Sequence, residues 1–406
     1  MQTRDEHLDR ILERALSELV RPGARVALAD ACGLPYALAA PLSRVAAWAG
    51  GVRLVLGWVP GPAPELDPGA FVDIRTVVGG PGLRGLVEAG AVHRVPAPLS
   101  ATPALLAGPL RPDLLLATVV RGPGGYRFGA EASWMRGLAE AGVPVAAVVS
   151  SSAPHADAGP PLPEVTVLGE VGGPAGAPCP IETPPPTPED LAIAGHVASL
   201  VPAGARIQFG PGRLSAAVVA ALDVPVSVDS GLLTDPVVDL DARGLLRGTP
   251  SATALHGSPR LYDWADRFGR SGHGVVRPVE YTHDVSRLAS GAPGPLVAVN
   301  TALEIDRDGQ VNVEGVAGSA AGMIGGHPDF AAAAARGPGL SVMALPATHR
   351  GRRTLVDRLA GPVTTPSHDV DVVVTEHGVA DLRGLGRDER RAALDRLWSH
   401  TATPHE

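Results

Sequence analysis

The sequence predicts an α/β fold built from two related halves, and three features of the chain point to it. Short apolar runs alternate with segments of helical periodicity over almost the whole length. A proline-rich stretch interrupts this alternation near the middle of the chain. The segment after that stretch repeats the pattern with which the first half opens. Together these features predict two open parallel sheets that are covered by helices and face each other across a cleft.

The predicted strands are nearly continuous apolar runs, as in parallel sheets that are covered on both faces. In the first half they span residues 24–31, 52–59, 113–120 and 143–151. In the second half they span residues 205–210, 224–231, 296–300, 340–347 and 370–376. Helical periodicity lies between them, at residues 34–50, 131–142, 188–201, 213–222 and 386–400. One more helix is predicted near the start, where leucines recur on one face from Leu8 to Leu19 before the Arg-Pro-Gly at residues 21–23.

The proline-rich stretch, residues 172–188, carries too many prolines for a regular helix or strand. It predicts an N-terminal domain over residues 1–171 and a C-terminal domain over residues 189–406. Residues 22–42 and 202–222 both read as Gly-Ala-Arg, a strand, a glycine-bearing turn and an apolar helix. Chance similarity in a chain rich in alanine and glycine is the alternative to a true repeat.

Composition excludes several classes of function. The net charge is −8, and no basic stripe with interleaved aromatic residues occurs, so nucleic acid is not an expected partner. All 34 basic residues are arginines. A chain without lysine can neither form a Schiff base nor supply the lysine of a GxxxxGK[ST] phosphate loop.

The sequence also gives predictions for the cellular compartment and for metal binding. Cys32 and Cys179 are too far apart in sequence for a CxxC zinc pair, and two cysteines make no disulfide framework. The first residues lack the apolar core of a signal peptide, and no apolar run reaches ~18 residues. The histidines, including His256, His273 and His283, show no metal-ligand spacing and are predicted to lie at the surface. These features predict a cytoplasmic protein without membrane contact or a metal site.

Several sequence blocks resemble, in order, one known family. They are ACGLPYAL from residue 31, DLLLATVVRGPGGYRFGAE from 113, IQFGPGRLSAAVVAAL from 207, DSGLLTDPVVDL from 229, NTALEIDRDGQVNVEG from 300, GMIGGHPDF from 322, ALPAT from 344 and VTTPSHDVDVVVTEHGVADLRG from 363. The order is similar to that of the acetyl-CoA hydrolases and 4-hydroxybutyrate CoA-transferases, which share the class I CoA-transferase fold. The resemblance implies an acyl-CoA and a small carboxylate as ligands, coenzyme A as a substrate and not a permanent cofactor, a homodimer, and a place in acetate metabolism.

Two glycine-bearing turns are candidate ligand-binding loops. Gly325 and Gly326 precede a predicted helix start at Pro328, where backbone amides favour an anion or oxyanion. With the resemblance, this loop is implied to hold the thioester carbonyl, while a plain tight turn is the alternative. Gly210 and Gly212 follow a predicted strand, and this weaker signal is equally consistent with a simple turn.

Two charged residues in the second half are further candidates. Arg350 begins a run of arginines that could bind the phosphates of CoA, although a solvated surface run explains it equally well. Glu376 ends a predicted strand, where functional side chains gather. It borders the site in one interpretation and only caps the turn in the other.

The sequence departs from the family at the catalytic glutamate. Aligning the tail TDPVVDL places Gly231 opposite that nucleophile, and glycine cannot form a glutamyl-CoA thioester. Three hypotheses remain open. Asp229 activates water for direct hydrolysis; a carboxylate from elsewhere, Glu131 or Glu376, serves as nucleophile; or the chain binds CoA esters without turnover. A sugar-phosphate isomerase or effector-binding domain of the same fold is a further alternative.

Overall fold

The computed structural model describes residues 6–156, 158–179, 183–270, 275–316 and 322–399. The chain forms two compact units. Unit 1 comprises residues 1–181 and 253–280, and unit 2 comprises residues 182–252 and 281–406. The first division falls inside the proline-rich stretch. Residues 253–280 differ from the expected domain boundaries, because they cluster with unit 1 although the predicted C-terminal domain contains them.

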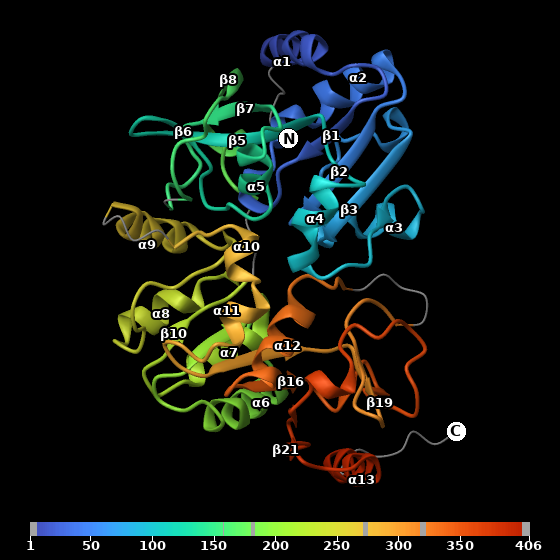
Figure 1. The fold of residues 1–406 in the computed structure, drawn as a ribbon, viewed down its shortest axis with the longest axis vertical. Coiled ribbons are helices and arrows are strands. Elements are labelled where there is room, and N and C mark those ends of the chain that lie inside the picture. The colour runs from blue at the N-terminus through green and yellow to red at the C-terminus, as the bar shows by residue number, and fades with distance from the viewer. Residues whose placement is uncertain (1–5, 157, 180–182, 271–274, 317–321, 400–406) are drawn as a thin grey trace. The chain divides into compact units, whose positions relative to one another are not determined.

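Unit 1 is built on one sheet with the strand order β4-β3-β2-β1-β5-β7-β8, in which neighbouring strands are parallel (Figure 1). A short strand, β6, pairs antiparallel with β5. The strands are β1 (Arg25–Leu28), β2 (Arg53–Trp58), β3 (Asp73–Gly79), β4 (His93–Arg94), β5 (Leu114–Gly122), β6 (Gly125–Arg127), β7 (Val145–Ser150) and β8 (Thr166–Val171).

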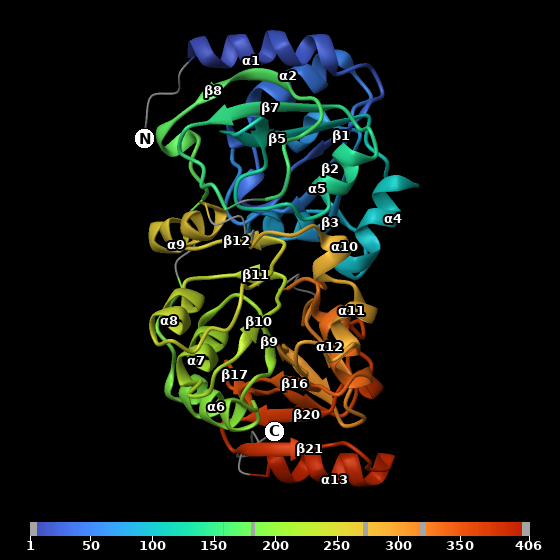
Figure 2. The same ribbon diagram turned by 60° about the vertical axis from the view of Figure 1, so that its left-hand side comes forward.

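Helices cover both faces of this sheet. On one side lie α1 (Glu6–Leu19) and α2 (Ala39–Ala49), whose leucines join the strand residues in one apolar core (Figure 2). On the other side lies α5 (Met135–Glu140). The remaining elements are α3 (Arg84–Glu88), α4 (Thr102–Ala107), β12 (Ala254–Leu255), α9 (Pro259–Arg270) and six short 3₁₀ turns, while α10 (Val279–Thr282) ends beyond residue 280.

The helix predicted from residue 131 begins only at residue 135, and residues 253–255 explain the difference. Glu131 forms an antiparallel bridge with Ala254, and the backbone nitrogen of Ala132 donates to the carbonyl of Thr253. The first residues of the predicted helix are therefore used as an extended strand edge. Sequence periodicity does not report such a long-range pairing.

Unit 2 has a sheet with the order β10-β9-β13-β16-β20-β21. The first five strands are parallel and β21 is antiparallel. They are β9 (Arg206–Phe209), β10 (Ser227–Val228), β13 (Leu296–Thr301), β16 (Leu340–Ala344), β20 (Val372–Thr375) and β21 (Gly378–Asp381). Short strands outside this sheet are β11 (Leu232–Leu233), β14 (Glu304–Asp306), β15 (Val311–Asn312), β17 (Thr348–His349), β18 (Arg352–Arg353) and β19 (Leu355–Val356).

Two sets of helices flank the sheet of unit 2 (Figure 2). One set is α6 (Pro188–Ser199), α7 (Arg213–Ala221) and α8 (Pro236–Ala242). The other is α11 (Val285–Ala289) and α12 (His327–Arg336), and α13 (Arg387–Leu397) lies beside β21. A capping box starts α6, because Thr187 accepts from the backbone of Asp190 and the Asp190 side chain accepts from Thr187.

The two sheets share a five-strand core of identical topology. In chain order, β1, β2, β5, β7 and β8 take the same places as β9, β10, β13, β16 and β20, all parallel. The Gly-Ala-Arg that opens β1 therefore matches the Gly-Ala-Arg that opens β9. This correspondence supports the internal repeat seen in the sequence, and each unit is an α/β layer structure as predicted.

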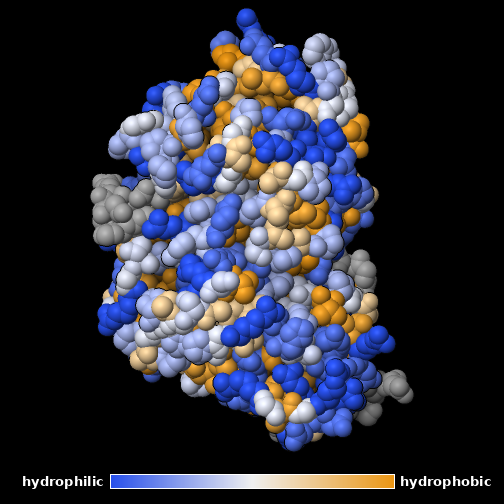
Figure 3. All heavy atoms as spheres, in the orientation of Figure 1, coloured by the Kyte–Doolittle hydropathy of each residue, from blue (hydrophilic) through white to orange (hydrophobic). Residues whose placement is uncertain are grey.

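No helix in the described part of the chain is long and apolar enough to span a bilayer. The face drawn in Figure 3 has hydrophilic and hydrophobic residues interspersed. Large exposed apolar side chains such as Trp48, Val72 and Leu191 come from different elements, which is ordinary for a folded protein.

Candidate functional site

The carboxyl ends of the parallel strands in unit 2 meet at one edge of the sheet, and most predicted site residues lie there. Gly210 follows β9, Asp229 follows β10 and Glu376 follows β20. Gly325 and Gly326 precede α12, and His327 at the start of that helix contacts the carbonyl of Thr301 at the end of β13. In open α/β sheets this edge is the usual place for a ligand.

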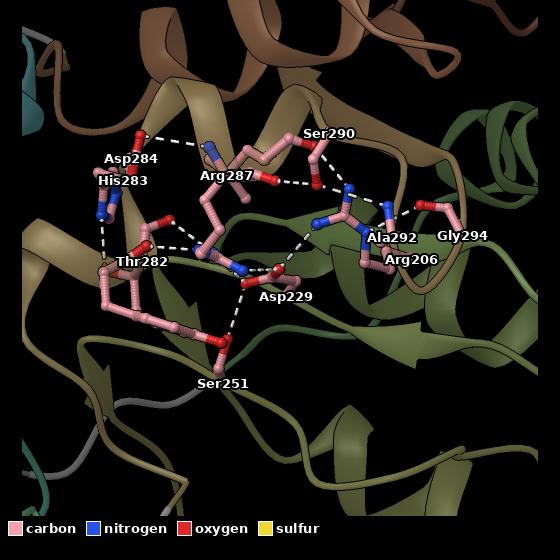
Figure 4. Close-up of polar contacts among 12 residues, drawn as sticks. Arg206, Asp229, Ser251, Thr282, His283, Asp284, Arg287, Ser290, Ala292 and Gly294 are labelled. Carbon is pink, nitrogen blue, oxygen red and sulfur yellow. Dashed lines mark hydrogen bonds and ion pairs between the residues drawn. The ribbon is translucent and has the colours of Figure 1, made fainter.

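Asp229 is buried, and its carboxylate accepts hydrogen bonds from four donor atoms (Figure 4). Its Oδ1 accepts from Ser251 Oγ at 2.7 Å and Arg287 Nη2 at 2.8 Å. Its Oδ2 accepts from Arg287 Nη1 at 2.6 Å and Arg206 Nη1 at 3.1 Å. Burial alone raises the pKa of Asp229, but the hydrogen bonds and charge of Arg287 outweigh burial, so the pKa is lowered overall. The carboxylate is therefore charged and fully engaged.

The two arginines around Asp229 are themselves fixed. Arg206 is 1% exposed and also donates to the carbonyls of Gly294 and Leu288. Arg287 stacks over the ring of Tyr281, with its guanidinium carbon 4.1 Å from the ring centroid. Figure 4 shows Arg206 and Arg287 on opposite sides of Asp229. This arrangement ties β9, β10 and α11 together, and a proton acceptor role for Asp229 would require Arg287 to withdraw.

Gly231 and Gly326 meet at one buried imidazole, that of His283. A Cβ at Gly231 would lie 3.1 Å from Nε2 of His283, and a Cβ at Gly326 would lie 2.3 Å from the same atom. His283 is 1% exposed, and its Nδ1 is 2.9 Å from Oγ1 of Thr282. Its Nε2 has no hydrogen-bond partner within the described residues. Burial lowers the pKa of His283 to about 3, so the ring is neutral at physiological pH.

The glycine loop before α12 combines a left-handed turn with the N-terminus of a helix. Gly325 has φ +52°, a left-handed conformation that favours glycine, and a Cβ there would meet nothing within 4 Å. Gly326 is the N-cap of the ten-residue α12. The first turn of a helix offers backbone N–H groups to a ligand. Both glycines are half-buried, so the loop is accessible from the surface.

Gly210 and Gly212 lie at the turn between β9 and α7. Gly212 is the N-cap of α7 with φ +114°, a conformation that only glycine adopts readily. A Cβ at Gly210 or Gly212 would meet nothing within 4 Å. Gly210 therefore lies at the same carboxyl edge as Gly231 and Gly326. The space next to Gly210 is open, whereas the imidazole of His283 occupies the space next to the other two glycines.

The two remaining predicted residues lie in different settings. Glu376 is half-buried, its Oε2 accepts from the backbone nitrogen of Ala347 at 2.8 Å, and its Oε1 is 3.7 Å from Nε2 of His377. Arg350 is exposed at the tip of the β17–β18 hairpin, with φ +51°. Glu376 thus belongs to the strand ends, while Arg350 is presented by a tight turn beyond them.

The surface placement predicted for the histidines is wrong for two of the three residues named. His256 is 0% exposed and His283 is 1% exposed, while His273 lies outside the described residues. Burial lowers the pKa of His256 to about 4. Spacing in the sequence carries no information about the packing that encloses an isolated histidine. Within the described residues, no group of three or more His, Cys, Asp or Glu is placed to hold a metal ion.

Unit 1 carries a second polar cluster at the matching edge of its own sheet. Asp30 follows β1, and Glu131 lies shortly after β6. Asp30 accepts from Ser133 Oγ at 3.1 Å and Trp134 Nε1 at 2.9 Å, both through Oδ2. Glu131 is 1% exposed, and neither of its carboxyl oxygens has a hydrogen-bond partner among the described residues. Burial raises the pKa of Asp30 to about 6.

The surroundings of Glu131 disfavour its charged form. Burial, and next the charge of Asp30, raise the pKa of Glu131 well above its ordinary value, which favours the protonated form of this carboxyl group. A Cβ at Gly33 would lie 2.2 Å from Oε1 of Glu131, so the carboxyl group packs directly on a glycine backbone. Sequence reasoning considered Glu131 as a relocated nucleophile, but a protonated carboxyl group is a weak one.

Cys32 and His256 complete the cluster of unit 1, and sequence reasoning assigned neither a role. The Sγ of Cys32 is 3.8 Å from Nδ1 of His256 and 3.4 Å from the hydroxyl of Tyr262. Burial, followed by the charge of Glu131, raises the pKa of the Cys32 thiol. The signal that could have revealed the cluster is the ADAC sequence at the end of a predicted strand. Neither Cys32 nor Cys179 forms a disulfide.

Comparison with known proteins finds similarity to enzymes that act on acyl-CoA thioesters. Residues 257–402 match the acetyl-CoA hydrolase/transferase C-terminal domain. A succinyl-CoA:cyclohexane-1-carboxylate CoA transferase of Geobacter metallireducens is 32% identical over 226 residues, covering 52% of this chain and 51% of that protein. A 4-hydroxybutyrate coenzyme A transferase of Clostridium kluyveri is 29% identical over 232 residues, covering 53% of each. The chain thus spans about half the length of the curated relatives it matches.

Solved structures extend the likeness to nearly the whole chain, as a likeness of fold. RipA from Yersinia pestis has a TM-score of 0.83 at 24% identity, covering 95% of this chain and 93% of that one. The 4-hydroxybutyrate CoA-transferase of Porphyromonas gingivalis has a TM-score of 0.73 at 22% identity, covering 95% and 92%. The fold, the matched domain and the curated relatives agree with the order of motifs in the sequence. Residues 257–402 thus resemble the C-terminal domain of acetyl-CoA hydrolases and transferases, and the similar curated proteins are CoA transferases and acetyl-CoA hydrolases.

Proposed function

We propose that this chain binds an acyl-CoA thioester at the carboxyl edge of the unit 2 sheet and hydrolyses it without an enzyme-bound glutamyl-CoA. The observation that carries the proposal is the meeting of Gly231 and Gly326 at that edge, with a neutral imidazole and no carboxylate between them. The similarity of residues 257–402 to the acetyl-CoA hydrolase/transferase C-terminal domain supports an acyl-CoA as ligand. The absent side chain at position 231 argues against a covalent intermediate there.

The parts of the site take distinct roles in this proposal. The Gly325–Gly326 loop and the first turn of α12 offer N–H groups to the thioester oxygen as negative charge develops on it. The exposed Arg350 meets a phosphate of CoA by charge-assisted hydrogen bonds. The open turn at Gly210 and Gly212 allows the ligand to approach the backbone closely.

Asp229 is the carboxylate predicted to activate water, but Glu376, predicted as an alternative nucleophile, suits that role better. Asp229 already accepts from four donors on three side chains. Glu376 accepts one backbone hydrogen bond, through Oε2. A general base contributes about 10²–10⁴-fold to a rate, so we expect Glu376→Gln to lower hydrolysis by at least about 100-fold with acyl-CoA binding retained.

The experiment pairs a binding assay with a turnover assay. Free CoA, acetyl-CoA, a small carboxylate and ribose 5-phosphate are tested for stabilisation of the protein against heat. A ligand at ~100 times its dissociation constant adds about 2.7 kcal/mol of stability. Release of free CoA thiol is then followed with each thioester that binds. Stabilisation by ribose 5-phosphate alone would replace this proposal with a sugar-phosphate function.

A second candidate function is a CoA-ester binding protein without turnover. The same observation favours it, because the place of the family nucleophile holds glycine while the surrounding loops persist. Stabilisation by acyl-CoA with no thiol release would select it. We also propose a cytoplasmic homodimer on the likeness to the family, and sedimentation of the purified protein tests the dimer.

A further inference from the structure

The space in front of Gly231 is already filled, and this changes what the glycine means. The Cα-to-Cβ direction at position 231 leads to Nε2 of His283 at 3.1 Å and to the ring of Phe330 at 3.5 Å. Both distances are measured from the position of a first side-chain atom, so a side chain at position 231 would force the imidazole to shift by a few tenths of an ångström. Gly231 is therefore matched to His283 and is not merely a position that has lost its side chain.

The imidazole is held where it is by contacts on several sides. Nδ1 of His283 is 2.9 Å from Oγ1 of Thr282, and its ring lies edge-on to Phe330 with 4.8 Å between centroids. Gly326 lies so near Nε2 that only a glycine fits there. These contacts leave the ring 1% exposed, although Gly231 and Gly326 are each half-buried. A side chain at position 231 or 326 therefore requires this enclosed ring to move.

We propose that His283 determines the reaction of this site, because its imidazole excludes any nucleophilic side chain from position 231 and leaves water as the acceptor of the acyl group. In that reaction, water adds to the thioester carbonyl carbon and the C–S bond breaks. The CoA thiolate takes up a proton released by the water. The inference rests on the proposed function, since it concerns the same acyl-CoA site.

Packing provides the first test, as a double-mutant cycle read by thermal unfolding. Gly231→Glu forces a side chain against His283, and we expect the melting temperature to fall by about 4–8 °C. In the double variant Gly231→Glu/His283→Ala the volume is free, so the melting temperature should lie within about 2 °C of His283→Ala alone. Gly210→Glu is the matched control at the same sheet edge, because nothing lies within 4 Å of a Cβ there. Its melting temperature should stay within about 2 °C of the natural protein.

Chemistry provides the second test. Each variant is incubated with acetyl-CoA and its intact mass is measured. The double variant should gain a covalent CoA thioester that maps to position 231, and the natural protein and Gly231→Glu alone should gain none. An adduct in Gly231→Glu alone, no adduct in the double variant, or an equal loss of stability in Gly231→Glu with and without His283 would each overturn the inference.

The two proposals fail in different ways. A natural protein that no acyl-CoA stabilises against heat would sink the proposed function and this inference together. Intact stabilisation by acyl-CoA, combined with independent effects at positions 231 and 283, would sink this inference alone.

Discussion

The carboxyl edges of the two sheets share a strand order but treat buried acid groups in opposite ways. In unit 2, Asp229 is surrounded by Arg206, Arg287 and Ser251, and its pKa is lowered. In unit 1, Asp30 accepts only from uncharged donors and Glu131 from none in the described residues, and both pKa values are raised. The carboxyl edges of a repeated topology thus lower the pKa of one buried acid and raise the pKa of the others. The side chains around a buried carboxyl group set its protonation state, and the fold does not.

The largest change in the free energy of unfolding is expected when the charged carboxylate of Asp229 in unit 2 is removed. Asp229→Ala leaves Arg206 buried beside Arg287 without their common partner, and breaking such a pair costs about 3–5 kcal/mol. Urea unfolding measures the loss. Asp381→Ala is the matched control, because its ion pair with Arg383 is about half exposed and should contribute less than about 1 kcal/mol. Equal losses in the two variants would show that the Asp229 network does not stabilise unit 2.

A second effect follows from the raised pKa of Asp30. Its folded pKa is about 6 against an ordinary value of 3.8, so the folded state binds this proton more tightly than the unfolded state. Stability is therefore greatest below the unfolded pKa and falls as the pH rises through the folded pKa, by about 3 kcal/mol for such a shift. Glu131 acts in the same direction, and Asp229 in the opposite one.

The measurement is urea unfolding from pH 4 to pH 8 for the natural chain and Asp30→Asn. The amide keeps an acceptor for Ser133 and Trp134 but cannot ionise, so this variant should lose less stability as the pH rises. If Asp30→Asn and the natural chain respond identically to pH, unit 1 does not raise the pKa of Asp30 in the way described.

The smallest effect concerns the backbone beside the unit 1 acids. Ala31, between Asp30 and Cys32, has φ +51°, and Ser133, which donates to Asp30, has φ +37°. Such left-handed conformations cost about 1 kcal/mol or more for residues other than glycine. We expect Ala31→Gly to raise the unfolding free energy by up to about 1 kcal/mol. Ala15→Gly, inside α1, should lower it by about 1 kcal/mol, and a loss in both variants would show that Ala31 is not strained.

The strands were predictable because each buried parallel strand is an unbroken apolar run. All nine predicted strands are present, although the run at residues 224–231 contributes only the two residues of β10. The strands β3 and β8 were missed. In β3 the exposed Arg75 interrupts the apolar pattern, and in β8 the exposed Thr166 and Val167 lie outside the covered core. In both strands the exposed residues break the apolar run by which a buried strand is recognised.

The candidate site was predictable only as far as it follows strand ends and glycines. Asp229, Glu376 and Gly326 were found because the end of a strand or the start of a helix marks them in sequence. His283 and His256 were not, because each is defined by contacts with residues far away in the chain. The four donors on Asp229 were equally invisible, since Arg206, Ser251 and Arg287 carry no local signature. Burial and charge pairing are tertiary properties that no short motif encodes.

Residues 253–280 belong to unit 1 although they follow the first segment of unit 2 in the chain. This order affects how unit 1 folds during protein synthesis. The backbone nitrogen of Leu255 donates to the carbonyl of Ala130, so β12 completes an edge that residues 1–181 leave open. After residue 181, the ribosome must add about 100 further residues before all of unit 1 has been synthesised, and this takes roughly 5–20 s at ordinary rates of elongation. During this interval the segment that holds Glu131 lacks its partner strand. Co-translational chaperones would therefore meet the nascent chain after its first domain-sized segment has emerged and before that segment can finish folding.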